Sequence, residues 1–404
     1  MPSFEEARKV ILDHVTALGS EIVPVPDAIG RVLAADVVAS WDLPSWNNSA
    51  MDGYAVRAED VTRSAALRVS GYIPAGTHSA EVVAAGTAAK ILTGAPLPPG
   101  ADSVVPVEDT EEREGTILVK GPVRPGANVR RRGEDIHAGE AVLKSGTVVG
   151  PGEVCLLATF AKLSVPVVRK ARVAVLSTGD ELVAPGEPLS PGKIHDSNSL
   201  AVSAAVRQAG GEPVALGIGR DDRASLRRLL EEGLRADALV TSAGVSVGDR
   251  DLVREVLQEL SVRQVFWKVN VKPGGPVAFA MHGARPVFSL PGNPVSSLLT
   301  FEQFVRPALL KMMGHRKVLR PLVRAVFQED LATKRGRVSL VRVRLERGPG
   351  GLLAFSAGNQ DTGILKTTLQ ADGIAIIPED FGAIAAGATV DVQILRGGFD
   401  MCEA

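Results

Sequence analysis

The amino-acid sequence predicts a multidomain α/β plus β fold: a central α/β domain, an inserted β module before it and a small β-barrel domain after it. Three observations lead to this prediction. The chain has 404 residues, more than one hydrophobic core usually organises. Strand-like and helix-like runs alternate in its middle, which indicates a mixed, mostly parallel sheet. Short Val/Ile runs broken by Gly and Pro dominate on either side.

The N-terminal domain is expected over residues 1–168. Residues 4–19 have the periodicity of an amphipathic helix, and a Pro/Trp/Asn-rich loop follows at 41–54. From about 47 to 145 the pattern becomes that of an all-β module. We therefore predict that this module is inserted into the N-terminal domain.

The central domain is expected over residues 169–315. Strand and helix patterns alternate from Arg172 onward, and a helix over 294–314 closes the domain. The run QVFWKVNVKPG is interpreted as a strand, with Lys268 and Lys272 on one face because they are four residues apart. Beyond it, residues 318–397 return to strand-like runs between Gly-rich turns, which favours a small β-barrel or sandwich.

The composition limits which classes of partner and which cellular compartment are expected. Lys plus Arg (45) nearly balances Asp plus Glu (46), so no overall charge draws the protein to nucleic acid or to a membrane surface. Cys155 and Cys402 fit neither a disulfide framework nor a zinc site, which indicates a reducing compartment. With no signal-peptide pattern and no long apolar stretch, a cytoplasmic location is expected.

The first candidate site is the loop after the first strand of the central domain. Ligands bind at the carboxyl ends of strands in open parallel sheets. Here the small residues Ser177, Thr178 and Gly179 leave the backbone accessible to an anion. The carboxylates of Asp180 and Glu181 can coordinate a cation. This combination suits a phosphate with its magnesium ion.

A second loop, from Ser242 to Asp251, is punctuated by Gly244 and contains Ser246. It leads into a helix whose N-terminal amides can bind an anion. Asp251 would bind a metal or act only as the helix N-cap, which is the commoner role of an Asp at this position.

Two more loops complete the set. Pro291, Gly292 and Asn293 lie at a strand-to-helix junction, where a rigid turn explains the proline but not the other two residues. Lys268 and Lys272 precede a Gly-rich turn, where two cations favour an oxyanion, although an exposed strand face is an equal interpretation.

Two carboxylate motifs lie outside the central domain, around Asp52 and Asp135, and both are in loops, where function concentrates. Asp52 precedes Gly, and taken by itself this pair favours a simple turn. The Arg triplet before Asp135 is usually a solvated face or a linker and could equally be an acid-binding patch, although the Gly-Glu-Asp that follows it favours a site. Neither a P-loop nor a GxGxxG fingerprint is present.

Six multi-residue motifs together carry a resemblance to a known family. In chain order they are SAMDGYAV, ILTGAPLPPGAD, RRRGEDI, STGDEL, SAGVSVGDRD and LPGNPVSS. Their order and spacing resemble those of MoeA proteins and of the E domain of gephyrin, over almost the whole chain. The resemblance implies a four-part protomer with a molybdopterin-binding α/β domain. It also implies a homodimer whose clefts include residues of the second protomer.

The resemblance implies a Mg²⁺-dependent molybdenum insertase, which takes molybdate and adenylylated molybdopterin as substrates and forms molybdenum cofactor and AMP. Residues matching positions implicated in family function are Asp52, Thr93, Asp135, Glu181, Asp221, Ser246 and Asp251. We assign Glu181, Asp221 and Asp251 to metal coordination and water activation, since carboxylates repel the molybdate dianion.

The remaining matched residues are assigned to substrate binding. Those in the central-domain loops are Ser177, Thr178, Gly179, Ser242, Gly244, Ser246, Pro291, Gly292 and Asn293. Lys268, Lys272, Arg342 and Thr362 match residues that relatives place near the oxyanion. The chain departs from the family pattern at Gly275, where some relatives have Lys, and at Asp361-Thr362, where a Gly-Ser pair is common.

Two other functions remain open from the sequence. A nucleotide phosphohydrolase would use the same Mg²⁺–phosphate cleft, and a non-enzymatic dimeric scaffold would match one role of the gephyrin E domain. The molybdopterin adenylyltransferase and acceptor molybdoenzymes are the candidate protein partners that the resemblance adds.

Overall fold

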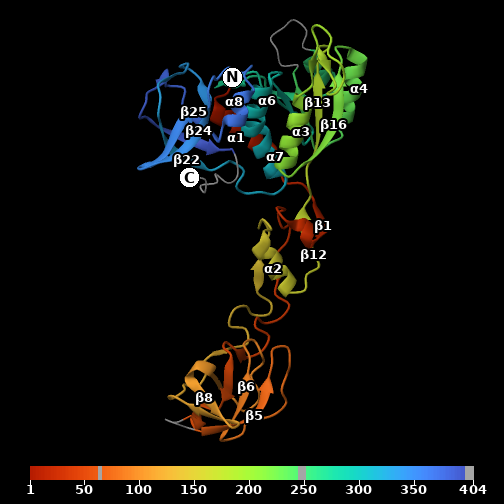
Figure 1. The fold of residues 1–404 in the computed structure, drawn as a ribbon. Helices are drawn as coiled ribbons and strands as arrows, with labels where there is room; N and C mark the ends of the chain where they lie inside the picture. The colour runs from red at the N-terminus through yellow and green to blue at the C-terminus, as the bar shows by residue number, and fades with distance from the viewer. Residues whose placement is uncertain (62–65, 244–251, 396–404) are drawn as a thin grey trace. The chain divides into compact units, whose positions relative to one another are not determined.

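A computed structural model describes residues 1–61, 66–243 and 252–395 of the chain (Figure 1). The chain divides into two compact units. The first comprises Met1–Ala34, Val148–Gly150 and Ser164–Ala404, and the second comprises Ala35–Thr147 and Pro151–Leu163. In the described part of the chain, no helix has the length and apolar character that crossing a membrane requires.

The first unit is built around a six-stranded sheet. In spatial order its strands are β16 (Glu212–Gly219), β13 (Arg172–Thr178), β17 (Ala238–Ser242), β21 (Arg285–Leu290), β20 (Ala278–His282) and β18 (Arg263–Phe266). The first four run parallel, whereas β20 is antiparallel to both of its neighbours. The predicted mixed, mostly parallel sheet is confirmed.

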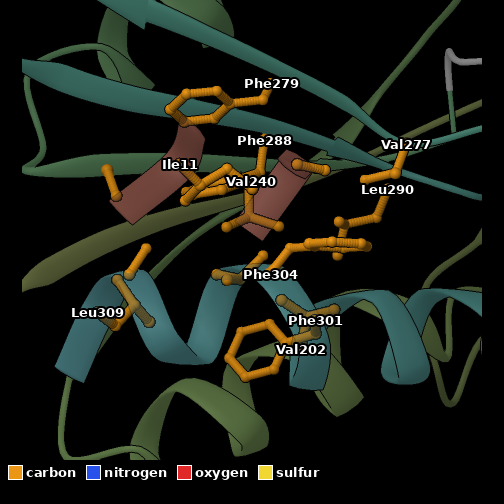
Figure 2. Packing of buried hydrophobic residues seen from close by; sticks show 14 of the residues in the cluster. Ile11, Val202, Val240, Val277, Phe279, Phe288, Leu290, Phe301, Phe304 and Leu309 are labelled. Atoms are coloured by element: carbon orange, nitrogen blue, oxygen red, sulfur yellow. The ribbon is translucent and has the colours of Figure 1, made fainter. Parts of the chain in front are cut away.

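Helices cover both faces of this sheet. The elements that pack with one apolar cluster are α1 (Phe4–His14), α3 (Asn198–Gln208), α6 (Pro294–Thr300), the π-helical η4 (Phe301–Val305) and α7 (Arg306–Met312). Figure 2 shows Phe301, Phe304 and Leu309 of these helices beneath sheet residues such as Phe288. The other face is covered by α4 (Arg223–Gly233) and α5 (Leu252–Glu259).

Two expected helices differ in detail from the structure. The N-terminal helix ends at His14 rather than residue 19, because Val15 is buried in an extended conformation. The closing helix is a run of three consecutive segments, α6, η4 and α7, with a π-helical turn in the middle.

The strand expected over QVFWKVNVKPG is wrong. β18 ends at Phe266, and β19 (Val271–Lys272) belongs to a different sheet. Between them the backbone turns back on itself, since the amide of Val269 donates to the carbonyl of Gly275. Val269 is also buried, which anchors this turn in the core. Lys268 therefore lies outside any strand and does not share a strand face with Lys272.

The C-terminal part of the first unit is a closed barrel. Its strands are β24 (Val338–Gly348), β25 (Gly351–Ser356), β22 (Leu322–Phe327), β28 (Thr389–Ile394) and β26 (Gly373–Ile377), and β26 pairs back with β24 to close the ring. Phe327, Val343 and Val392 are fully buried in its core. This confirms the predicted β-barrel. Because β19 pairs with β24, the turn after Lys272 is fixed against the barrel.

Short elements complete the first unit. They are β1 (Ser20–Pro24), η1 (Val25–Ala28), β12 (Ser164–Val168), β14 (Leu182–Val183), β15 (Ile194–His195), β23 (Leu331–Ala332), α8 (Lys366–Gln370) and β27 (Ala383–Ile384). The pair β14 and β15 runs parallel, which brings the loop after β13 beside the segment that precedes α3.

The second unit is mainly β-structure, as predicted for the inserted module. Its six-stranded sheet has the order β7 (Ser103–Pro106), β4 (Gly53–Val56), β6 (Thr87–Ile91), β5 (Ala66–Ile73), β9 (Thr116–Val119) and β8 (Thr110–Arg113). Smaller elements are β2 (Val37–Val38), β3 (Asn48–Ser49), η2 (Ala58–Asp60), η3 (Val107–Asp109), β10 (Val129–Arg130), β11 (Ala141–Leu143) and α2 (Pro151–Thr159). Tyr54, Val105 and Ile117 form part of its core.

Candidate active site

A cavity of about 460 Å³ lies where β13, β17 and β21 end. The four parallel strands point their carboxyl ends the same way, so the loops that follow them converge. Sequence-predicted residues that line this cavity are Thr178, Glu181, Ser242, Pro291, Gly292 and Asn293. Residues from three loops predicted separately are thus brought together.

The loop after β13 places one carboxylate in the cavity. Gly179 has a φ of +140°, and a Cβ atom there would lie 2.3 Å from a carboxylate oxygen of Glu181. Glycine is needed here because it permits this backbone conformation and because it leaves room for the Glu181 carboxylate to lie against the backbone. Ser177 lies beneath the cavity, buried, and its hydroxyl donates to Asp196 at 2.8 Å.

The proposed metal trio is divided in the structure. Glu181 lines the cavity, whereas Asp221, which follows β16, does not; its amide donates to Oδ1 of Asp180 at 3.2 Å. Asp251 lies outside the described residues, as do Gly244 and Ser246. Among residues 1–61, 66–243 and 252–395, no three His, Cys, Asp or Glu side chains form a group that could hold a metal.

A Mg²⁺ ion nevertheless fits the donor chemistry of this cavity. In nucleotide enzymes Mg²⁺ usually keeps several waters and takes one or two carboxylates together with substrate phosphate oxygens. Glu181 supplies one such carboxylate beside space for a substrate. The remaining ligands would then come from the substrate and from water.

Sequence reasoning missed the segment 195–198, which also lines the cavity. Asp196 is buried and accepts hydrogen bonds from Ser177 and from the amide of Ser199. Asn198, the first residue of α3, donates through Nδ2 to the hydroxyl of Ser242 and the carbonyl of Gly292, both at 2.7 Å. The only local signal was an Asp-Ser-Asn before a helix, which reads as an N-cap.

The loop after β21 connects the cavity with the barrel. Pro294 is the first residue of α6, as expected from its fixed φ. Asn293 donates from Nδ2 to the hydroxyl of Thr362 at 3.2 Å. A predicted residue of the central domain therefore contacts a predicted residue of the C-terminal domain.

A second cavity, of about 390 Å³, lies on the barrel side of this contact. Lys272, Lys334 and Thr362 line it, together with Gln360 and Asp361. Two cations and several hydrogen-bond donors give it the character of an anion site. Lys268 is exposed and lines neither this cavity nor the first one.

Arg342 lies in β24 with only 1% of its surface exposed, and it is not among the residues that line the second cavity. Its Nη2 donates to the backbone carbonyls of Asn359 and Asp361, both at 3.2 Å. Within the described residues, its Nε and Nη1 atoms have no hydrogen-bond partner. Burial lowers the pKa of Arg342, and the nearby Asp361 carboxylate opposes that shift.

The carboxylate of Asp361 is held within its own loop. Its Oδ1 accepts from the amide of Gly363 at 2.7 Å, and its amide donates to Oδ1 of Asn359 at 2.8 Å. This is the turn geometry that short polar side chains favour. The departure from the family's Gly-Ser pair thus adds a loop cap as well as a negative charge.

Three predicted residues lie in the second unit. Oδ1 of Asp52 accepts from both the amide and the hydroxyl of Thr93, each at 2.7 Å, and these bonds lower the pKa of Asp52. Asp135 is exposed, and its amide donates to the carbonyl of Leu43. The structure therefore pairs Asp52 with Thr93, and it shows Asp135 only in a surface loop.

Comparisons with known proteins cover the chain from end to end. The MoeA N-terminal region (domain I and II) matches residues 2–161, the probable molybdopterin binding domain matches 174–311, and the MoeA C-terminal region (domain IV) matches 324–395. Molybdopterin molybdenumtransferase 2 of Mycobacterium tuberculosis is 38% identical, over 97% of this chain and 99% of its own.

A molybdopterin molybdenumtransferase of Nostoc sp. is 36% identical, over 98% of this chain and 94% of its own. Two solved structures of MoeA from Pyrococcus horikoshii, 34% and 32% identical, align with a TM-score of 0.84. They cover 98% of this chain and 99% and 100% of theirs. The chain therefore belongs to the MoeA family of molybdopterin molybdenumtransferases, transferases of molybdenum cofactor biosynthesis.

Proposed function

We propose that this protein inserts molybdate into adenylylated molybdopterin, releasing AMP and forming molybdenum cofactor, in a Mg²⁺-dependent reaction. The names of the relatives support the transfer of molybdenum to molybdopterin. The adenylylated form of the substrate and the release of AMP come from the family resemblance.

One structural observation carries the proposal. Two cavities of different character lie in the same unit, and the hydrogen bond from Asn293 to Thr362 joins their walls. The first has a carboxylate, Glu181, and loops at the ends of parallel strands, which suit a phosphorylated ligand. The second has Lys272 and Lys334, which suit an oxyanion. An insertase needs both kinds of site side by side.

The chemistry assigned to the first cavity is cleavage of the phosphoanhydride that joins molybdopterin to AMP. A bound Mg²⁺ would neutralise charge on the phosphate oxygens and lower the pKa of bound water. Glu181 would hold the cation and orient the attacking water. The oxygen of that water would bond to the phosphorus on the pterin side as the bond from that phosphorus to the bridging oxygen breaks, so that AMP leaves with the bridging oxygen and the proton of the water passes to solvent. The carboxylates Asp221 and Asp251 remain part of this proposal.

The chemistry assigned to the second cavity is binding of molybdate. Arg342 supports this role because its buried guanidinium has two donor atoms without partners in the described structure. A buried donor without an acceptor costs about 1–3 kcal/mol, so these two atoms are the ones that would gain most from an oxyanion ligand. Lys272, Lys268 and Thr362 complete the proposed oxyanion set.

The proposal includes a homodimer, with the molybdopterin adenylyltransferase and acceptor molybdoenzymes as protein partners, all on the basis of the resemblance. Asp52, Thr93 and Asp135 are kept as functional residues of the second unit. The Asp52–Thr93 hydrogen bonds support this, because they hold an exposed carboxylate in one orientation and in its charged form.

The experiment is AMP release from adenylylated molybdopterin by the purified protein with Mg²⁺, with and without molybdate. Glu181→Gln, which has nearly the same shape but no charge, is the test variant. Gln258→Ala, on helix α5, is the control. We expect molybdate-dependent release that only Glu181→Gln abolishes. Release that ignores molybdate would indicate a phosphohydrolase, and no release at all would favour a scaffold.

A further inference from the structure

The segment that leads into α3 is hydrogen-bonded to the ends of the strands around the first cavity. Asp196 is buried, and its Oδ1 accepts from the hydroxyl of Ser177 at 2.8 Å and from the amide of Ser199 at 3.0 Å. Ser177 is the penultimate residue of β13, just before the loop that carries Glu181. The start of α3 is thereby tied to β13.

Asn198 ties the same helix to the other two strands. Its Nδ2 donates to the hydroxyl of Ser242, the last residue of β17, and to the carbonyl of Gly292, just beyond β21. The Gly292 carbonyl can only accept, so it fixes which end of the amide points toward it. Oδ1 of Asn198 is buried and has no partner among the described residues. One side chain thus bridges two strand ends whose contact residues lie 44 and 94 residues away from it in the chain.

The bridge continues into the barrel. Gly292 is followed by Asn293, whose side chain donates to Thr362 at 3.2 Å. Thr362 follows Asp361, and the carbonyl of Asp361 accepts from Nη2 of Arg342 at 3.2 Å. A continuous line of covalent and hydrogen bonds therefore runs from the start of α3 to the buried guanidinium.

We propose that Asn198 is a positioning residue for the insertase reaction. By holding Gly292, Asn198 fixes the position of Asn293 relative to Thr362. It thereby fixes the distance between the first cavity, which would hold the phosphate, and the second cavity, which would hold the oxyanion. Reactions that join two bound groups are sensitive to such placement, and a misplacement of about 1 Å can cost on the order of 100-fold in rate. This inference rests on the proposed function.

The test uses Asn198→Leu, a substitution of similar size that removes both hydrogen bonds without adding charge. We expect half-saturating molybdate to rise about fivefold or more, the size expected for loss of the hydrogen bond to Gly292 that the inference invokes, and we expect the rate of AMP release to fall. Ser199→Ala, at the next residue of α3, keeps the backbone amide that donates to Asp196, so we expect its molybdate requirement to stay near that of the wild type.

Gln208→Ala, at the other end of α3, is the control for a generally loosened helix. Asn198→Ser serves if Asn198→Leu does not fold, with the same expected direction. A variant that weakens binding of adenylylated molybdopterin while half-saturating molybdate stays unchanged would overturn the inference, because Asn198 would then act only within its own cavity. If the wild type itself releases no AMP in response to molybdate, the proposed function fails first.

Discussion

Asn293 and Thr362 are 69 residues apart in the chain and are joined by a 3.2 Å hydrogen bond between their side chains. Asn293 belongs to the loop between β21 and α6, and Thr362 belongs to the loop between β25 and α8. The contact therefore places the wall of the cavity that Glu181 lines against the wall of the cavity that Lys272 and Lys334 line. This relationship underlies the proposed reaction.

Thr362→Val should raise half-saturating molybdate about fivefold, because it keeps the shape of the side chain but removes the acceptor for Asn293. Binding of adenylylated molybdopterin should change little. The measurement is AMP release as a function of molybdate concentration. Thr362→Ser, which retains the hydroxyl, should stay close to the wild type; equal effects of both substitutions would count against a role for this bond.

Asp361→Asn should lower half-saturating molybdate about two- to fivefold. The amide oxygen can still accept from Gly363, so the loop is preserved, but a negative charge beside Arg342 is removed. Titration of AMP release with molybdate measures the change. Asp361→Ala, which also removes the loop cap, separates the two effects, and a higher molybdate requirement for Asp361→Asn would contradict the electrostatic argument.

Gly179→Ala should reduce AMP release about tenfold or more, since its Cβ would lie 2.3 Å from the Glu181 carboxylate and would displace it. Gly192→Ala is a matched control. Gly192 also has a positive φ, of +84°, but a Cβ atom there meets nothing within 4 Å. Both proteins are assayed after their thermal stabilities have been compared. Equal losses of activity in the two variants would contradict the assignment of Glu181 to cation binding.

Asp52→Asn should destabilise the second unit near neutral pH but not in acid. Hydrogen bonds from Thr93 hold the pKa of Asp52 below its usual range. A depressed carboxylate pKa contributes stability above the unfolded value of about 3.9, and this stability is lost as pH falls through the folded pKa. The difference in free energy of unfolding between wild type and variant should therefore shrink below about pH 4.

Urea unfolding across pH 3 to 7 measures this difference. A Trp267→Phe background leaves only Trp41 and Trp46, both in the second unit, so tryptophan fluorescence then follows that unit alone. A difference that is constant over the whole pH range would rule out the charged form of Asp52 as its source.

Much of the fold could be predicted from the sequence because the pattern of apolar residues is local. The alternation in the central domain predicted its parallel strands, since each buried strand is a short apolar run such as Val173–Leu176. The strand expected through Lys268 failed for the opposite reason. Its residues alternate as a strand does, but hydrogen bonding to Gly275 and burial of Val269 fold them into a turn.

The candidate site was only partly accessible to sequence reasoning. Loops at strand ends pointed to Glu181 and Asn293, because the topology of parallel sheets makes those ends converge. Asn198 was missed because its partners lie 44 and 94 residues away, and an Asn at the start of a helix has an ordinary local explanation. The burial of Arg342 in β24 likewise depends on tertiary packing, which no local sequence pattern predicts.

The most direct test of the insertase proposal is stoichiometry. Adenylylated molybdopterin, molybdate and Mg²⁺ are incubated with the purified protein, and AMP released is compared with molybdenum incorporated into the pterin product. We expect one molybdenum atom per AMP, with both lost together in Glu181→Gln. AMP released without incorporation of molybdenum would contradict it.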